Sequence, residues 1–97
     1  MLETLTHEVF AKHLQSDFEL RLDDGDPIVL TLHEVKTLEG SDAKDRMPFS
    51  VIFNGPKEPV LEQAIYALEH PDMGDLGLFL VPLMADAQGA QYEAVFT

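Results

Sequence analysis

The amino-acid sequence predicts a mainly β protein: a small six-stranded antiparallel barrel, or a two-layer sandwich, with one short N-terminal α-helix. Six segments of alternating or continuous apolar residues recur along the chain, and turn residues separate them. The connections are too short for crossover helices, which favours antiparallel pairing. Several segments are apolar on both faces, which favours a closed or nearly closed barrel. The 97 residues suit a single domain, 1–97, with the helix over 4–15 and the barrel over 17–97.

The helix is expected over Thr4–Gln15. Thr6 is a candidate N-cap, and Glu8 lies in the first turn, where a negative charge interacts favourably with the helix dipole. Four apolar residues recur at helical spacing, which predicts a face packed on the core. In a barrel, such a helix would close one open end. The residues of this apolar stripe are Leu5, Val9, Phe10 and Leu14.

The first two strands are expected to form a hairpin. Phe18–Leu22 alternates between apolar and charged residues, as a half-buried strand does. Asp23–Asp26 contains Asp-Gly, a strong hairpin signal, and lacks the ligand spacing of a calcium loop. In Ile28–Leu38 the apolar residues change phase, so we expect a β-bulge near His33-Glu34. The inward side chains of this second strand are Ile28, Leu30 and Leu32, and Val35 and Leu38 are the residues that fall out of step with them.

A long loop and a third strand follow. Glu39–Arg46 is polar throughout and is expected to be the longest loop. Met47–Asn54 is the third strand, and Gly55–Pro59 then interrupts the ladder before an irregular crossing. The inward side chains of this strand are Phe49, Val51 and Phe53.

The most apolar part of the chain predicts a second hairpin. Its strands are Ala64–Glu69 and Leu76–Val81, and the turn between them spans His70–Asp75. Both strands are apolar on both faces, which is typical of central strands that are covered on both sides. We therefore expect the rest of the chain to wrap around this hairpin.

The last strand is expected over Gln91–Phe96, with Tyr92, Ala94 and Phe96 on its inner face. Pro82 is expected to end the regular pairing of the preceding strand, and Asp86–Gly89 to turn the chain.

The charge of the chain is strongly negative. Eighteen Asp and Glu face six Lys and Arg, a formal net charge of −12. Such a surface repels nucleic acid and anionic lipid, so neither is expected to bind directly. A net charge of this size generally gives high solubility. It could also serve a specific function, either binding a partner protein with a basic surface or mimicking a nucleic-acid backbone.

Composition also bounds the compartment. The absence of cysteine excludes disulfides and thiolate metal sites and fits a reducing cytoplasm. The N-terminus has no basic region of the kind that begins a secretory signal, and no apolar run is long enough to span a membrane. A cytoplasmic location is expected.

No motif commits the chain to a reaction. His7 and His13 point away from each other on a helix, so they cannot share a metal, and no metal or cofactor is expected. The serines, Ser16, Ser41 and Ser50, lie in no nucleophile-elbow motif, and no phosphate-binding glycine loop is present. Rim carboxylates with His70 could in principle exchange protons. The sequence therefore predicts a protein that is not an enzyme.

The candidate binding segment is Asn54–Gln63, because its two prolines and Gly55 give a rigid loop, and rigid loops commonly carry recognition. The alternative is that Val60 and Leu61 cap the core beneath. The predicted binding residues are Pro56, Pro59, Leu61, Gln63 and Tyr66, with Glu69 and His70 at the adjacent rim.

Four stretches of the chain, LETLTHEVF, FNGPKEPVLEQAIYALEHPDMG, LFLVP and YEAVF, resemble a family of small uncharacterised bacterial proteins, a domain of unknown function of about this length. The resemblance covers nearly the whole chain; Ala64 departs from it, since glycine is expected there. It implies no catalytic residue, and an accessory or assembly role linked to phage-tail-collar-like proteins. The residues that carry it best are Gly55-Pro56, Gln63, Tyr66, Glu69-His70-Pro71 and Tyr92-Glu93-Ala94.

Together these observations predict a non-enzymatic protein-binding or accessory module. One alternative is a small-molecule-binding barrel or hydrolase that uses rim carboxylates and His70. Another is an acidic nucleic-acid mimic. The protein is expected to be a monomer, or a homodimer through edge strands if the barrel is open.

Overall fold

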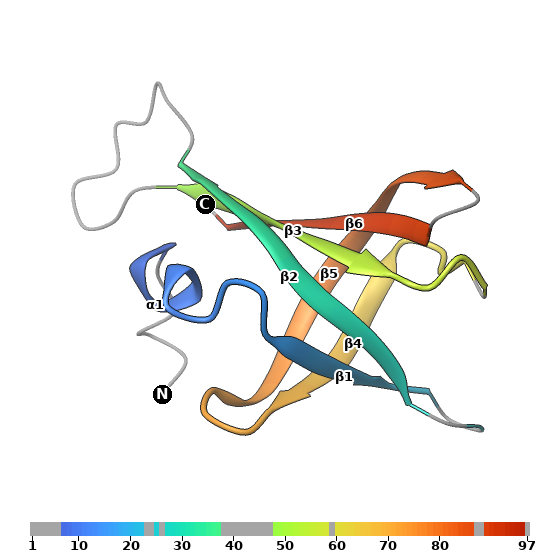
Figure 1. The fold of residues 1–97 in the computed structure, drawn as a ribbon, viewed down its shortest axis with the longest axis horizontal. Helices are drawn as coiled ribbons and strands as arrows, with labels where there is room; N and C mark the ends of the chain where they lie inside the picture. The colour runs from blue at the N-terminus through green and yellow to red at the C-terminus, as the bar shows by residue number, and fades with distance from the viewer. Residues whose placement is uncertain are drawn as a thin grey trace.

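The computed structural model describes residues 7–22, 25, 27–37, 48–58, 60–86 and 89–96. The strands close into an antiparallel barrel in the order β1-β2-β3-β6-β5-β4 (Figure 1). The predicted six-stranded barrel with a short N-terminal helix is therefore confirmed, and the sandwich alternative is not. The elements are α1 (His7–Ala11), β1 (Asp17–Arg21), β2 (Ile28–Thr37), β3 (Phe49–Gly55), β4 (Ala64–His70), β5 (Gly74–Asp86) and β6 (Gly89–Phe96).

Alternating side chains fill the barrel. In β1, Phe18 and Leu20 are buried while Glu19 and Arg21 are exposed, as the sequence pattern predicts. Aromatic rings from several strands meet in the interior; the Phe18 and Phe53 ring centroids, for example, lie 5.3 Å apart. Leu20, Leu30, Leu32, Leu68 and Leu80 have no exposed surface, so the barrel is a packed core and not an open channel.

Two β-bulges bend the sheet into a closed form. The register of β2 against β3 shifts between Leu32 and Glu34, which confirms the predicted bulge. A second shift lies between Pro82 and Met84, where β5 pairs with β6. The expectation that pairing ends at Pro82 is wrong, because β5 continues to Asp86 after the bulge. Proline has no backbone N–H to donate to the neighbouring strand, and the irregular pairing at a β-bulge accommodates it.

Helix α1 lies across one end of the barrel, beside the start of β3 and the end of β6 (Figure 1). Phe10 has no exposed surface, and its ring lies 5.8 Å from that of Phe49 and 5.4 Å from that of Phe96. The expected stripe is wrong at Leu14, which is 42% exposed, because the helix ends at Ala11. The expected helix start, with Thr6 and Leu5, lies outside the described residues, as do Leu38, the Glu39–Arg46 loop and Pro59. No helix of the described part is long and apolar enough to cross a membrane.

The β4–β5 hairpin is not covered on both sides, so that expectation is wrong. Its inner residues Leu68, Leu78 and Leu80 are buried, as predicted. On the outer side, Ile65 is 75% exposed and Phe79 is 51% exposed. Closure of the barrel buries the inner face of this hairpin, and no described element lies over its outer face.

Gly89 begins β6 with a positive φ of 151°, and a Cβ there would lie 2.5 Å from the carbonyl oxygen of Gly55. Because a backbone atom blocks that space, Gly89→Ala is expected to lower the free energy of unfolding by about 1–3 kcal/mol. Urea unfolding followed by circular dichroism measures this change. Gly77→Ala is the matched control, since a Cβ on Gly77 meets nothing within 4 Å. Equal effects of the two substitutions would contradict the close approach of Gly55 and Gly89.

Candidate functional site

His70 ends β4 and is a buried polar residue, only 6% exposed. Its ring packs on Phe18 with 4.5 Å between centroids and lies 4.7 Å from the ring of His13. Nδ1 accepts hydrogen bonds from the backbone N–H of Asp72, at 3.0 Å, and of Met73, at 3.2 Å. Nε2 lies 3.1 Å from Oγ of Ser16. We name His13, Ser16, His70 and Asp72 the His70 cluster.

The hydrogen bonds decide the protonation of His70. Two backbone N–H groups point at Nδ1, so Nδ1 carries a lone pair and the proton of the neutral ring is on Nε2. Nε2 therefore donates to Ser16 Oγ, which in turn donates to the carbonyl oxygen of His13 at 2.5 Å. Burial, and then the nearby His13, lower the pKa of His70, while Asp72 opposes them more weakly.

This arrangement resembles a nucleophile–base pair but has the wrong polarity for one. A general base must present a lone pair to the serine hydroxyl, and here Nε2 presents a proton. No carboxylate orients Nδ1; the turn backbone does. The contacts therefore make the His70 cluster a structural link between the segment after α1 and the β4–β5 turn. Sequence reasoning missed the proximity of Ser16 and His70 because 54 residues separate them.

The same cluster brings together three groups that could ligate a metal. The candidate ligand atoms of His13, His70 and Asp72 all lie within 4.8 Å of one another. Both ring nitrogens of His70 already have hydrogen-bond partners, however. A metal would have to displace either the turn N–H groups or Ser16. The donor set therefore fits a hydrogen-bonded link better than a metal site.

The predicted binding loop is divided between surface and core. Pro56 is exposed and lines an open pocket with Pro27 and Val29, and Gln63 is exposed just before β4. Leu61 is only 7% exposed, and its N–H donates to the buried hydroxyl of Tyr92 at 2.8 Å. Leu61 thus caps the core, as the alternative expected, whereas Val60 is 51% exposed and the expectation that it also caps the core is wrong.

Tyr66 lies on the inner side of β4 and is partly buried. Its hydroxyl donates to the carbonyl oxygen of Glu62 at 2.6 Å. Burial, followed by the negative charge of Glu62, raises the pKa of Tyr66. The Tyr66 side chain therefore fixes the position of the segment around Glu62, which leads into β4.

Glu69 belongs to a row of three carboxylates. It lies opposite Glu19 of β1 and opposite Asp75 of β5. Arg21 donates two hydrogen bonds to it, from Nε to Oε2 at 2.7 Å and from Nη2 to Oε1 at 3.1 Å. The bond to Glu69, and then its charge, raise the pKa of Arg21.

An open pocket of about 460 Å³ adjoins this row. We name it the acidic pocket. Three carboxylates in the row face one guanidinium, so negative charge is left over. The residues that line it are Asp17, Glu19, Val29, Glu69, His70, Pro71 and Asp75.

A different surface lies on the outer side of β4, β5 and β6. Ile65 and Phe79 are paired across β4 and β5, and both are exposed. Val95 of β6 is 53% exposed, and Val81 of β5 is partly buried. We name these four residues the apolar face. The sequence reasoning identified the hairpin's outer apolar side chains but expected them to be covered.

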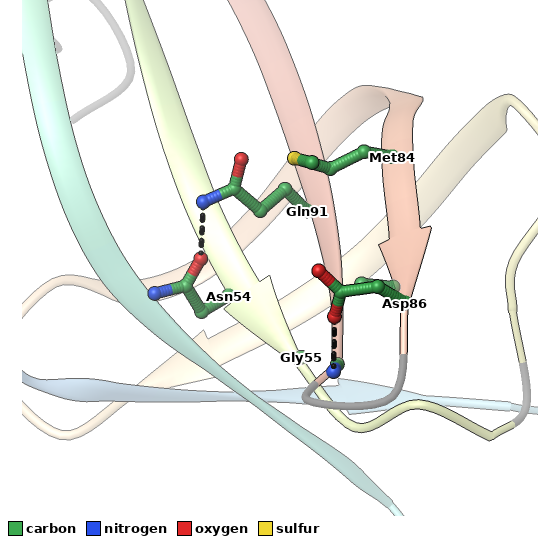
Figure 2. Close-up of a pocket in the computed structure, with 7 residues that line it drawn as sticks. Asn54, Gly55, Met84, Asp86 and Gln91 are labelled. Atoms are coloured by element: carbon green, nitrogen blue, oxygen red, sulfur yellow. Dashed lines mark hydrogen bonds between the residues drawn. The ribbon is translucent and has the colours of Figure 1, made fainter.

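A small pocket lies where β3, β5 and β6 meet (Figure 2). Gln91 Nε2 donates to Asn54 Oδ1 at 2.9 Å, and the N–H of Gly89 donates to Asp86 Oδ1 at 3.2 Å. Figure 2 shows the Met84 side chain beside Gln91 at the rim. The volume is about 200 Å³, below the roughly 300–1,000 Å³ of ordinary small-molecule sites. The amide pair therefore serves as a cross-strand contact.

In the part of the chain that the structure describes, apolar side chains occupy the barrel interior. Phe18, Phe49, Phe53 and Leu78 fill it, and each is at most 3% exposed. The three pockets described above all open at the surface. A filled interior counts against the hypothesis of a ligand-binding barrel.

Comparisons with known proteins agree with the resemblance seen in the sequence. A family model described as "Domain of unknown function (DUF6916)" matches residues 5–96. No curated protein and no solved structure matches the chain. Since the family model covers nearly its whole length, the chain belongs to this family of a domain of unknown function.

Proposed function

We propose that the protein is a non-enzymatic protein-binding module that serves another protein as an accessory or assembly partner. The observation that carries the proposal is the apolar face. Ile65 and Phe79 present two large side chains, side by side, to solvent. Single exposed apolar residues are ordinary on folded proteins, but adjacent ones that form a contiguous patch are typical of interaction surfaces.

The charge around the apolar face indicates what kind of partner fits. No Lys or Arg follows Lys57 in the sequence. The second half of the barrel is therefore uniformly acidic or neutral, apart from Arg21 reaching across from β1. A partner with an apolar centre and a basic margin complements this surface. The acids of this part are Glu58, Glu62, Glu69, Asp72, Asp75, Asp86 and Glu93.

The competing functions have less support. Catalysis by His70 requires a lone pair on Nε2, and the turn hydrogen bonds favour the other tautomer. A nucleic-acid mimic would present carboxylates where this surface presents Ile65 and Phe79. Of the predicted binding residues, Gln63 and Glu69 flank the exposed side of β4 and keep a contact role in this proposal.

Replacing Phe79 with the photocrosslinker p-benzoylphenylalanine tests the proposal in cells of the native host. We expect one dominant protein to be crosslinked from position 79. Ile65→Ser should lower its yield at least about tenfold, because central apolar contacts dominate binding energy. The readout is mass spectrometry of the crosslinked product.

The matched control places the same crosslinker at Leu14, which is also exposed but lies after α1. The same proteins captured from both positions, or no protein captured from position 79, would contradict the proposal. Folding of each variant is checked by its thermal melting temperature.

A further inference from the structure

The outer side of the β4–β5 hairpin changes from apolar to acidic along its length. The strand register places Ile65 opposite Phe79, then Ala67 opposite Gly77, and then Glu69 opposite Asp75. All six positions lie on the outer side, since the intervening residues face the core. One strip of surface thus has an apolar end, a flat middle and an acidic end.

The acidic end is a pocket and not only a row of charges. Glu19 extends the row onto β1, and Asp17 and Asp75 line the acidic pocket beside it. Arg21 binds both oxygens of Glu69, and its single positive charge faces three carboxylates, so the row keeps a net negative charge. A pocket of about 460 Å³ is large enough for the end of a lysine or arginine side chain.

The closed barrel restricts what can lie on this strip. Along the strip, β4 and β5 pair with each other from Ile65 opposite Phe79 to Glu69 opposite Asp75, so a segment that lies on this outer face does not extend the sheet. An extended segment would leave its own N–H and C=O groups without partners at the contact. A helix satisfies those groups internally, and the small Ala67 and Gly77 let it lie close to the sheet.

The dimensions of the strip match a helix with a simple pattern. Ile65 and Glu69 lie four positions apart along β4, about 13 Å at the usual rise of a strand. Two turns of an α-helix span about 11 Å, and a long basic side chain covers the remainder. An apolar residue at i and a Lys or Arg at i+7 or i+8 would reach both ends.

We propose that the partner segment is a basic amphipathic helix that lies along β4 and β5, with its apolar side chain on Ile65 and Phe79 and its Lys or Arg in the acidic pocket. This inference rests on the proposed protein-binding function. A second copy of the chain that presents the same face is disfavoured as the occupant, because its β4, β5 and β6 carry no Lys or Arg to meet these acids.

A set of helical peptides tests the spacing. Each is alanine-rich, about 20 residues long so that it forms a helix, and carries the same Leu and Phe anchor and the same two Arg residues. Only the distance from anchor to Arg changes: one, two or three turns on the same helix face. We expect the two-turn peptide to bind about tenfold more tightly than the others, as measured by fluorescence anisotropy at moderate salt.

Variants of the protein separate the two contacts. Asp75→Asn should remove the preference for two turns, whereas Glu34→Gln, which removes an exposed acid on β2, should leave it. Phe79→Ser should weaken all three peptides. Equal binding of the three peptides, or a preference that survives in Asp75→Asn, would overturn the helix inference. So would a homodimer, seen by sedimentation, that Phe79→Ser dissociates.

The outcomes also separate this inference from the proposed function. A protein crosslinked from position 79, together with equal binding of the three peptides, would leave protein binding in place and remove the basic helix. No crosslinked protein would remove both.

Discussion

Phe10→Ala is expected to lower the free energy of unfolding by about 3–5 kcal/mol, a large part of the stability of a domain of this size. Phe10 is fully buried although it lies on a helix of only five residues. Its ring packs against Phe49 and Phe96, which stack on each other at 4.6 Å. Removing the ring leaves a cavity at the end of the barrel that the two remaining rings fill poorly. Chemical denaturation followed by circular dichroism gives the change.

Leu14→Ala is the control for Phe10→Ala. Leu14 belongs to the same predicted apolar stripe but is substantially exposed, so its truncation is expected to cost less than about 1 kcal/mol. If the two substitutions cost the same, α1 would be a surface segment and would not be the closure of the barrel.

The period-2 pattern accounts for most of the fold that the sequence predicts. Phe18–Leu22 alternates clearly enough to fix which side chains point inward, and in Met47–Asn54 the large residues Phe49, Val51 and Phe53 do so, although Ser50 and Ile52 between them are buried as well. The change of phase after Leu32 predicts the bulge, because a strand can keep its apolar side chains inside only by inserting a residue there. These features depend on near neighbours in the chain, and a single sequence contains them.

The features that the sequence did not predict depend on the closed sheet. Apolar residues on both faces of a strand do not say whether the outer face is covered, so the exposure of Ile65 and Phe79 was missed. The pairing of Pro82 depends on a bulge opposite Tyr92 in another strand. The contact between Ser16 and His70 exists only once β1 and β4 pair to close the barrel. Long-range contacts of this kind leave no local pattern.

His70→Ala is expected to lower the free energy of unfolding by about 2–4 kcal/mol, since it removes a buried ring and the acceptor of two backbone N–H groups. His70→Asn should cost less, because its amide oxygen can lie near the position of Nδ1 and keep the turn hydrogen bonds. Urea unfolding at neutral pH measures both variants. A smaller loss of unfolding free energy in His70→Asn than in His70→Ala would show that the turn hydrogen bonds contribute to the stabilisation by His70. Equal losses would instead assign the effect to packing against Phe18.

The pH dependence of the same variants tests the protonation of His70. The folded protein holds His70 neutral, because burial and the adjacent His13 lower its pKa below the ordinary value of 6.5. When the pH falls through 6.5, the unfolded chain takes up a proton at this position and the folded protein does not, so the stability advantage over His70→Asn shrinks. The loss stops once the pH is below the lowered folded pKa.

Wild type and His70→Asn share the same carboxylates, including Asp72 and the acids of the acidic pocket. Their titration therefore cancels in the difference between the two free energies of unfolding. His33→Asn is the control for losing a histidine at an exposed position of β2. A stability difference between wild type and His70→Asn that stays constant from pH 5 to pH 8 would show that His70 binds its proton equally in both states. The lowered pKa of His70, and with it the neutral state of the buried ring just below pH 6.5, would then be wrong.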